Sequence, residues 1–216
     1  HSLGINLSIM SADIINSILK RNSIVANDIS AIGYHGQTIR HHPDIQPAFS
    51  IQIGCPSTLA HHTKIKTIAD FRMADIAAGG QGAPLVPAFH KAAFHSTDEN
   101  RLIVNIGGIA NITYLPATED IEPTGFDTGP GNTLLDEWIN KCQQKSYDSE
   151  GAWAKTGQLI PTLLEAMMHD IYILKEAPKS TGKEYFNLDW LTDLLKPYSN
   201  AQPEDIQRTL LEFTCL

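Results

Sequence analysis

Glycines that follow short apolar segments restrict the fold of this chain more than any other feature. In α/β sheets, ligands bind beyond the carboxyl ends of strands, and glycine there lets backbone N–H groups approach an anion. Five such points occur in about 100 residues, more than turns alone require. They are Gly33 with Gly36, Gly54, Gly79-Gly80 with Gly82, Gly107-Gly108, and Gly129 with Gly131. The pattern predicts an α/β fold with a binding site at strand ends.

Strand and helix patterns alternate along the chain, which favours a layered sheet with helices on its faces. The expected strands are 31–34, 48–54, 65–69, 102–105 and 111–115. The expected helices are 8–20, 57–61 (a single turn), 84–94, 133–141, 162–174, 188–195 and 204–213. Leu85, Ala88 and Phe89 are predicted to face inward. Gly107-Gly108 is predicted to join two strands as a hairpin in which glycine supplies positive φ.

Composition restricts the class of protein. The chain has 216 residues, 42% hydrophobic and 19% charged, as expected for one large domain or two small ones. A net charge of −8 disfavours nucleic-acid and anionic-membrane partners. No continuous apolar run approaches the roughly 18 residues of a membrane span, and residues 1–4 do not resemble a signal peptide. The three cysteines lie far apart and in no CxxC pair, so a reduced, cytoplasmic protein is expected.

Asp127 is the strongest candidate catalytic residue. It lies in GFDTGPGN, residues 125–132, which leads into the predicted helix at Thr133. A carboxylate at such a turn can cap the helix. Asn132 and Thr133 are nearer to the helix, so the Asp127 carboxylate is predicted to face a ligand, where it suits a general base.

Further polar residues follow two other predicted strands. Asp70 and Arg72 come after the strand at 65–69, and arginine suits recognition of a carboxylate or phosphate. His35 and Gln37 come after the strand at 31–34 and offer donors to sugar hydroxyls. We expect these side chains at one edge of a sheet.

A phosphate site is predicted at the hairpin, where Asn105 precedes Gly107-Gly108 in a strand-turn-strand segment able to wrap phosphate. Neither GxxxxGK[ST] nor GxGxxG occurs, so a nucleotide would be bound in another way. Nine histidines raise the alternative of a zinc hydrolase, yet HExxH is absent and no metal ligand set is predicted. A serine hydrolase would need GxSxG, which is also absent.

Several segments together resemble the anhydro-N-acetylmuramic acid kinase family. They are YHGQT (34–38), DFR (70–72), GGQGAPLVP (79–87), NIGGIANIT (105–113), GFDTGPGN (125–132) and KSTGKE (179–184). The resemblance implies a two-lobed, actin-like ATPase (ribonuclease H-like) α/β architecture. Residues 1–100 would be the remainder of the first lobe with its sugar-site insertions, and 101–216 the beginning of the second lobe with the phosphate hairpin and catalytic loop.

The resemblance also implies a reaction. The family uses ATP and Mg²⁺ to hydrolyse the 1,6-anhydro ring of anhydro-N-acetylmuramic acid and phosphorylate O6, giving N-acetylmuramic acid 6-phosphate in cell-wall recycling. Asp127 matches the catalytic base. The expected phosphate-binding residues are Gly107, Gly108, Gly129, Gly131 and Asn132, and the expected substrate-binding residues are Arg72, Asp70, His35, Gln37 and Asn105. The implied protein is a cytoplasmic homodimer that binds an amino sugar, without nucleic acid or membrane.

Two family segments do not occur in this sequence: a first phosphate loop of the type Gly-Thr-Ser-x-Asp-Gly and a later Gly-Gly-Gly segment. The architecture is therefore expected to be incomplete at both ends, and the isolated polypeptide to lack turnover. The alternative is a catalytically inactive fragment or a sugar-binding module derived from the kinase. Residues 179–184 are open to two readings, a phosphate-binding segment or a solvated loop.

Overall fold

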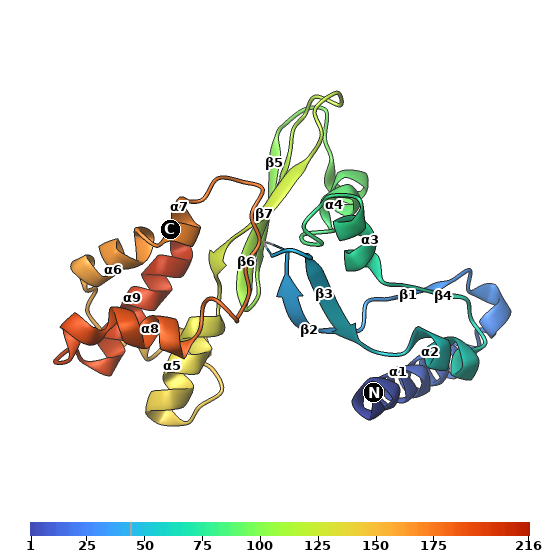
Figure 1. Cartoon of the computed structure of the whole chain (residues 1–216), viewed down its shortest axis with the longest axis horizontal. Coiled ribbons are helices and arrows are strands. Elements are labelled where there is room, and N and C mark those ends of the chain that lie inside the picture. The colour runs from blue at the N-terminus through green and yellow to red at the C-terminus, as the bar shows by residue number, and fades with distance from the viewer. Residues whose placement is uncertain (44) are drawn as a thin grey trace. The chain divides into compact units, whose positions relative to one another are not determined.

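The structure is a computed structural model that describes residues 1–43 and 45–216. Its backbone contacts divide the chain into two compact units, His1–Ala83 and Pro84–Leu216. Each unit has its own sheets and helices (Figure 1). The chain is a mixed α/β protein, as the alternation of sequence patterns predicts, and the assignment of residues 1–100 and 101–216 to two lobes stays a prediction.

The first unit contains two small sheets. Its parallel pair is β1 (Ile32–Tyr34) with β4 (Thr67–Ala69), and its antiparallel pair is β2 (Gln37–His42) with β3 (Phe49–Ile53). Its helices are α1 (Ser2–Arg21), α2 (Pro56–Thr63) and α3 (Phe71–Ala77), with a 3-10 turn at Ala26–Asp28. The sequence patterns anticipate all of these elements except β2, α3 and the 3-10 turn.

Helix α1 packs through a stripe of small residues. Gly4, Ser8 and Ala12 are buried at a spacing of four, which places them on one face. A Cβ added at Gly4 would lie 3.1 Å from the Gly54 nitrogen, so this close approach favours glycine. In the described part of the chain, α1 alone is long and apolar enough to cross a membrane, with a mean hydropathy of 1.3. Its apolar positions are interrupted by polar ones, so no continuous apolar run corresponds to it.

The second unit is built on one antiparallel sheet in the order β5 (Arg101–Ile106), β6 (Ile109–Leu115), β7 (Thr124–Pro130). Its helices are α4 (Pro87–Phe94), α5 (Thr133–Gln143), α6 (Pro161–Met168), α7 (Ile171–Leu174), α8 (Leu188–Leu194) and α9 (Pro203–Cys215). Short 3-10 turns lie at Ser149–Gly151, Ala154–Thr156 and Lys196–Tyr198. The β5–β6 hairpin turns at Gly107-Gly108, the predicted position.

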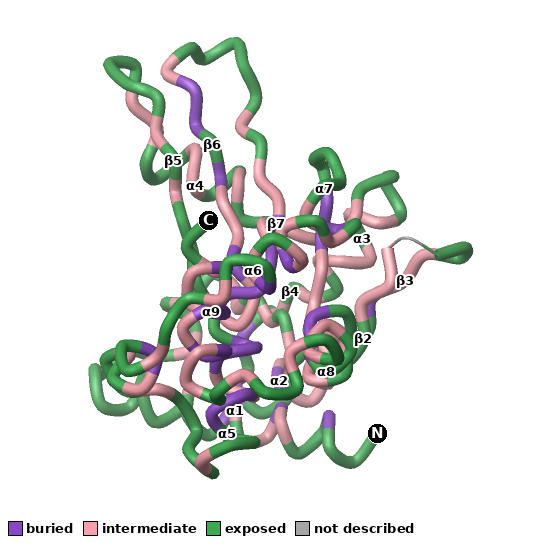
Figure 2. Tube along the Cα trace, turned by 90° about the vertical axis from the view of Figure 1, so that its left-hand side faces the viewer, coloured by how far each residue is buried: buried purple, intermediate pink, exposed green. Residues whose placement is uncertain are grey.

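The core of this unit lies among the helices that follow the sheet, where Figure 2 shows buried stretches of the trace. Phe186 is fully buried and meets Tyr172, Trp190 and Phe213 as ring neighbours. Around it pack buried apolar residues of α5, α6, α8 and α9: Leu134, Leu135, Trp138, Leu163, Met167, Leu191, Ile206, Leu210 and Phe213. This cluster provides a rigid base for the strand that carries Asp127.

Two helix predictions need correction. The helix expected over 162–174 is two helices, because Asp170 interrupts it and its carboxylate accepts the Tyr172 N–H at 2.7 Å, starting α7. Helix α4 begins at Pro87, so Leu85 precedes it, and Leu85, Ala88 and Phe89 are all exposed rather than inward. His90 of the same helix contacts β6, where its Nδ1 lies 2.9 Å from the Thr113 hydroxyl.

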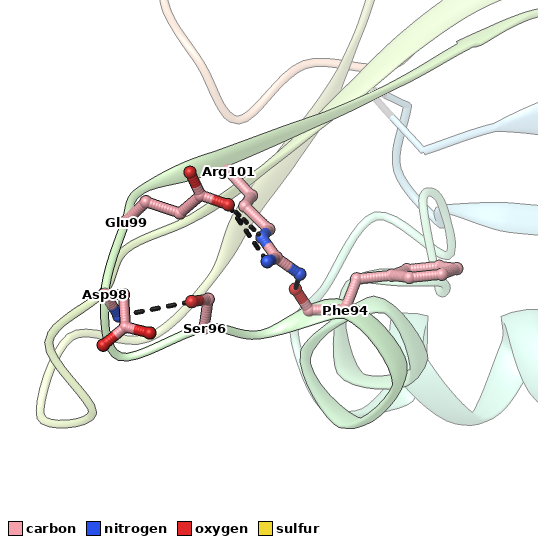
Figure 3. Close-up of polar contacts among 5 residues, drawn as sticks. All are labelled: Phe94, Ser96, Asp98, Glu99 and Arg101. Carbon is pink, nitrogen blue, oxygen red and sulfur yellow. Dashed lines mark hydrogen bonds and ion pairs between the residues drawn. The ribbon is translucent and has the colours of Figure 1, made fainter.

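The connection from α4 to β5 is held by Arg101, the first residue of the strand (Figure 3). Its Nε donates to Glu99 Oε1 at 3.0 Å, and its Nη1 donates to the Phe94 carbonyl at the end of α4 at 2.9 Å. Asp98 N–H donates to the Ser96 hydroxyl at 3.2 Å within the same loop. These contacts fix where β5 begins.

Candidate active site

Asp127 lies on strand β7 rather than in the turn that the glycines predict. It is 7% exposed and pairs with Asn111 on the neighbouring strand β6. The prediction of a turn was wrong because small residues that suit a turn also let a strand pack closely. Gly125 of the same strand is an example, since a Cβ added there would lie 3.0 Å from the Ile112 carbonyl oxygen on β6.

The segment at 179–181 holds Asp127 from its other side. Asp127 N–H donates to the Lys179 carbonyl at 3.1 Å, and Thr181 N–H donates to Asp127 Oδ2 at 3.0 Å. The Tyr172 hydroxyl donates to the Asp127 carbonyl at 2.7 Å. Backbone and carboxylate are therefore both fixed, as a positioned base requires.

Lys179 anchors this segment from the inside. It is 7% exposed, and its Nζ donates to the carbonyls of Ile173 at 2.9 Å and Tyr172 at 3.2 Å. Burial lowers the pKa of the Lys179 ammonium, and Lys175 lowers it further. Ser180 is also buried. The reading of 179–184 as a solvated loop therefore fails at Lys179 and Ser180.

Three polar residues form a row across the sheet. Asn105 on β5 pairs with Asn111 on β6, which pairs with Asp127 on β7. Directly opposite residues share a face, so this row brings the predicted residues Asn105 and Asp127 to one surface. Asn111 was missed by sequence reasoning. The sequence does contain a signal for it. Asn105 and Asn111 lie three residues before and three residues after Gly108, the centre of the hairpin, so they are expected to pair.

The hairpin turn rests on the start of α5. The N–H groups of Gly131 and Thr133 donate to the Gly108 carbonyl at 2.9 and 3.0 Å, and Asn132 N–H donates to the Gly107 carbonyl at 2.8 Å. A Cβ at Gly131 would collide with the Gly107 oxygen, which explains that glycine. These donors hold the hairpin, and phosphate binding by Gly107, Gly108, Gly129, Gly131 and Asn132 stays a prediction.

Two details of the turn differ from expectation. Gly107 and Gly108 are not among the residues with positive φ, so the turn does not use glycine for that purpose. A Cβ at Gly108 would lie 3.3 Å from Lys183 Cε, the end of a flexible side chain, and 3.9 Å from Thr133 Cβ, so the turn has little space to spare there. The second detail concerns Asn132, which precedes α5 without capping it through its side chain. Its amide instead donates to the Gly107 carbonyl at 3.3 Å.

In the first unit, three of the predicted sugar-binding residues come together. Arg72 Nε donates to His35 Nε2 at 2.9 Å, and Arg72 Nη1 donates to the Gly82 carbonyl at 3.0 Å. His35 and Asp70 line a cavity of about 340 Å³. Asp70 has a φ of 64°, a left-handed conformation uncommon outside glycine, so its carboxylate is aimed by a constrained backbone.

Gln37 does not join this group of contacts. It begins β2, where it pairs with Ile53, and its side-chain amide donates to the Thr38 carbonyl at 3.2 Å. Gly36, next to it, has a φ of 69°, and a Cβ there would collide with the Ile53 oxygen. The role of Gln37 in sugar binding stays a prediction.

A metal ion held by protein side chains alone needs several ligands gathered in one place. Among the described residues, no three His, Cys, Asp or Glu side chains gather to hold an ion. Mg²⁺ commonly keeps several waters and is bound by one or two carboxylates plus substrate phosphates.

Comparison with known proteins agrees with the motifs. The family model described as anhydro-N-acetylmuramic acid kinase matches residues 1–216. Proteins named anhydro-N-acetylmuramic acid kinase from Shewanella putrefaciens, Shewanella oneidensis and Shewanella baltica are each 51% identical over 201 residues, covering 93% of this chain. The aligned part is 54% of each relative, so the chain spans about half the length of the curated relatives it matches. Because the family model matches residues 1–216 and the relatives are 51% identical, the chain belongs to the anhydro-N-acetylmuramic acid kinase family.

Proposed function

We propose that this chain supplies the catalytic base and the second phosphate-binding segment of a kinase. The reaction hydrolyses the 1,6-anhydro bond of anhydro-N-acetylmuramic acid and transfers the γ-phosphoryl group of ATP to O6. The observation that carries the proposal is the buried Asp127 carboxylate, held by Thr181 N–H at 3.0 Å in strand β7, whose last residue, Pro130, pairs with Ile109 next to the glycine hairpin.

In the proposed reaction, Asp127 accepts one proton. Its carboxylate takes a proton from the water that attacks the anomeric carbon, the C1–O6 bond breaks, and O6 becomes the nucleophile toward phosphorus. The products are N-acetylmuramic acid 6-phosphate and ADP. Phosphoryl transfer depends mainly on positioning and charge neutralisation, and Mg²⁺ bound with ATP would supply part of the latter.

The remaining roles follow the predicted sites. Arg72, His35 and Asp70 would contact the sugar and its lactyl carboxylate, since a guanidinium suits a carboxylate, with Gln37 and Asn105 as further contacts. Gly107 and Gly108 would face the phosphates. The proposal includes a two-lobed actin-like architecture, a cytoplasmic location and a homodimer, all of which are expectations from family membership.

The test is a chimera in which this chain replaces the matching segment of the Shewanella oneidensis relative. With anhydro-N-acetylmuramic acid and ATP, the chimera is expected to release ADP and form a 6-phosphate ester, while the isolated chain is expected to be inactive. The unmodified relative is the control for assay conditions. A folded chimera that binds both substrates without turnover would favour the sugar-binding module instead.

A further inference from the structure

The KSTGKE segment contains two lysines with opposite environments. Lys179 is buried and bonded to the carbonyls of Tyr172 and Ile173. Lys183 is exposed, and no hydrogen bond or ion pair joins it to any residue that the structure describes. A lysine without a protein partner is ordinary on a surface, so its position decides whether it has a function.

Lys183 lies against the hairpin turn. A Cβ added at Gly108 would lie 3.3 Å from Lys183 Cε and 4.0 Å from Lys183 Nζ. The ammonium therefore stands beside the glycine predicted to face phosphate. A positive charge next to backbone that accommodates an anion is the usual arrangement of a phosphate-binding lysine.

Lys183 also lies near Asp136, an acidic residue in the first turn of α5. Burial raises the pKa of the Asp136 carboxyl on α5, and the Lys183 ammonium acts in the opposite direction. Asp136 is the acidic residue of the first turn, and its own N–H bonds back to the Asn132 carbonyl at 2.8 Å. Two neighbouring hydroxyls, on Thr133 and Thr181, are buried without a partner among the described residues.

The same short segment reaches Asp127. Thr181 N–H donates to Asp127 Oδ2, and two residues later Lys183 lies against Gly108. Residues 181–183 thus connect the proposed base to the hairpin over a short distance along the chain. The Lys183 side chain therefore starts two residues from the backbone that holds the Asp127 carboxylate.

We propose that Lys183 binds the polyphosphate chain of the nucleoside triphosphate, with its ammonium beside Gly108. This inference rests on the proposed function for its choice of ligand. It divides the segment by role, with Lys179 fixing the fold and Lys183 contacting phosphate. Lys183 is then a binding residue that the sequence motif alone did not distinguish from its neighbour.

The test measures binding of inorganic tripolyphosphate to the 216-residue chain by calorimetry and by amide resonances of Gly107, Gly108 and Thr181. Lys183→Ala is expected to weaken binding about tenfold or more, as loss of a charge-assisted contact does. Lys183→Arg should retain most of the affinity. Lys155→Ala removes the same charge from another exposed lysine and should leave the affinity unchanged.

Each outcome bears on the proposal. Equal affinity in Lys183→Ala and the unsubstituted chain, resonance changes confined to residues outside the hairpin, or no binding of tripolyphosphate at millimolar concentration would overturn it. Circular dichroism of the variants excludes loss of folding as the cause. The proposed kinase reaction is judged separately, because an inactive chimera with Lys183-dependent tripolyphosphate binding would remove that reaction and retain the phosphate contact.

Discussion

The main-chain N–H of Thr181 donates to the Oδ2 atom of Asp127 at 3.0 Å, joining residues that lie 54 positions apart in the chain. The donor is backbone, so the bond does not depend on the Thr181 side chain, and it needs only an acceptor oxygen at position 127. It fixes one oxygen of the carboxylate and thereby its direction.

Replacing Asp127 with asparagine tests the base. Asparagine keeps the shape and an oxygen able to accept from Thr181 N–H, but it cannot take a proton. Turnover of the chimera is expected to fall about 10²- to 10⁴-fold, the usual contribution of general base catalysis. ADP release measures the rate, and retained ATP binding is the control. If the variant turned over at nearly the normal rate, the base would have to be sought elsewhere, first at Asp70.

Replacing Arg72 with lysine tests sugar recognition. Arg72 reaches both His35 and the Gly82 carbonyl, and a lysine has no planar fork to serve two directions. We expect the KM of the chimera for anhydro-N-acetylmuramic acid to rise about tenfold, as loss of about 1.4 kcal/mol implies, with a smaller change in kcat. An unchanged KM would place the lactyl carboxylate at another residue.

Replacing Lys179 with methionine tests the anchor of the 179–181 segment. The two carbonyls of Tyr172 and Ile173 lose their donor, which is expected to lower the free energy of unfolding by about 1–3 kcal/mol. Urea unfolding followed by tryptophan fluorescence measures this, since Trp138, Trp153 and Trp190 all lie in the second unit. Lys155→Met is the matched control, and equal loss in both variants would contradict the anchoring role.

Asp170 links three elements of the second unit. Its carboxylate accepts from Tyr172 N–H at 2.7 Å, from the Tyr185 hydroxyl at 3.0 Å and from Trp190 Nε1 at 2.9 Å. Asp170→Ala leaves these donors without their acceptor, so a loss of about 2–4 kcal/mol is expected in urea unfolding. Glu165→Ala, at an exposed position of α6, should change stability by less than about 0.5 kcal/mol. Similar values for both would show that Asp170 is not a structural centre.

Tyr185 gives a prediction at alkaline pH. Burial, and then its hydrogen bond to Asp170, raise the pKa of Tyr185 from 10.0 to about 12. Between these values the folded chain holds a proton that the unfolded chain releases, so stability falls as pH rises from about 10 to 12. Tyr185→Phe lacks this proton, and its stability should fall less over the same interval. Urea unfolding followed by circular dichroism compares the two, and parallel pH dependences would contradict the raised pKa.

Several elements were predictable because their signals are local. The glycine hairpin, helix α5 and the strands β1, β3 and β4 follow from apolar spacing and turn residues. Asp127 was identified because few side chains surround it in sequence. Family membership followed from short motifs, each of which places several specific residues in order.

Other elements depended on contacts between distant residues. Strand β7 formed where the sequence favoured a turn, because Asn111 pairs with Asp127 and the Lys179 carbonyl accepts its N–H. On α4, Phe89 is exposed while its neighbour His90 contacts Thr113 on β6. Such pairings depend on which strand lies beside which, and periodicity within one segment carries no information about its neighbour.

The two lysines of KSTGKE show where the division lies. The sequence by itself determined the α/β class, the family, and the residue types that a base and a phosphate hairpin need. Only the tertiary structure decided that Lys179 is buried against Tyr172 while Lys183 stands beside Gly108. The physical reason is that the surroundings of a charge are set by packing between segments far apart in the chain, which local sequence does not encode.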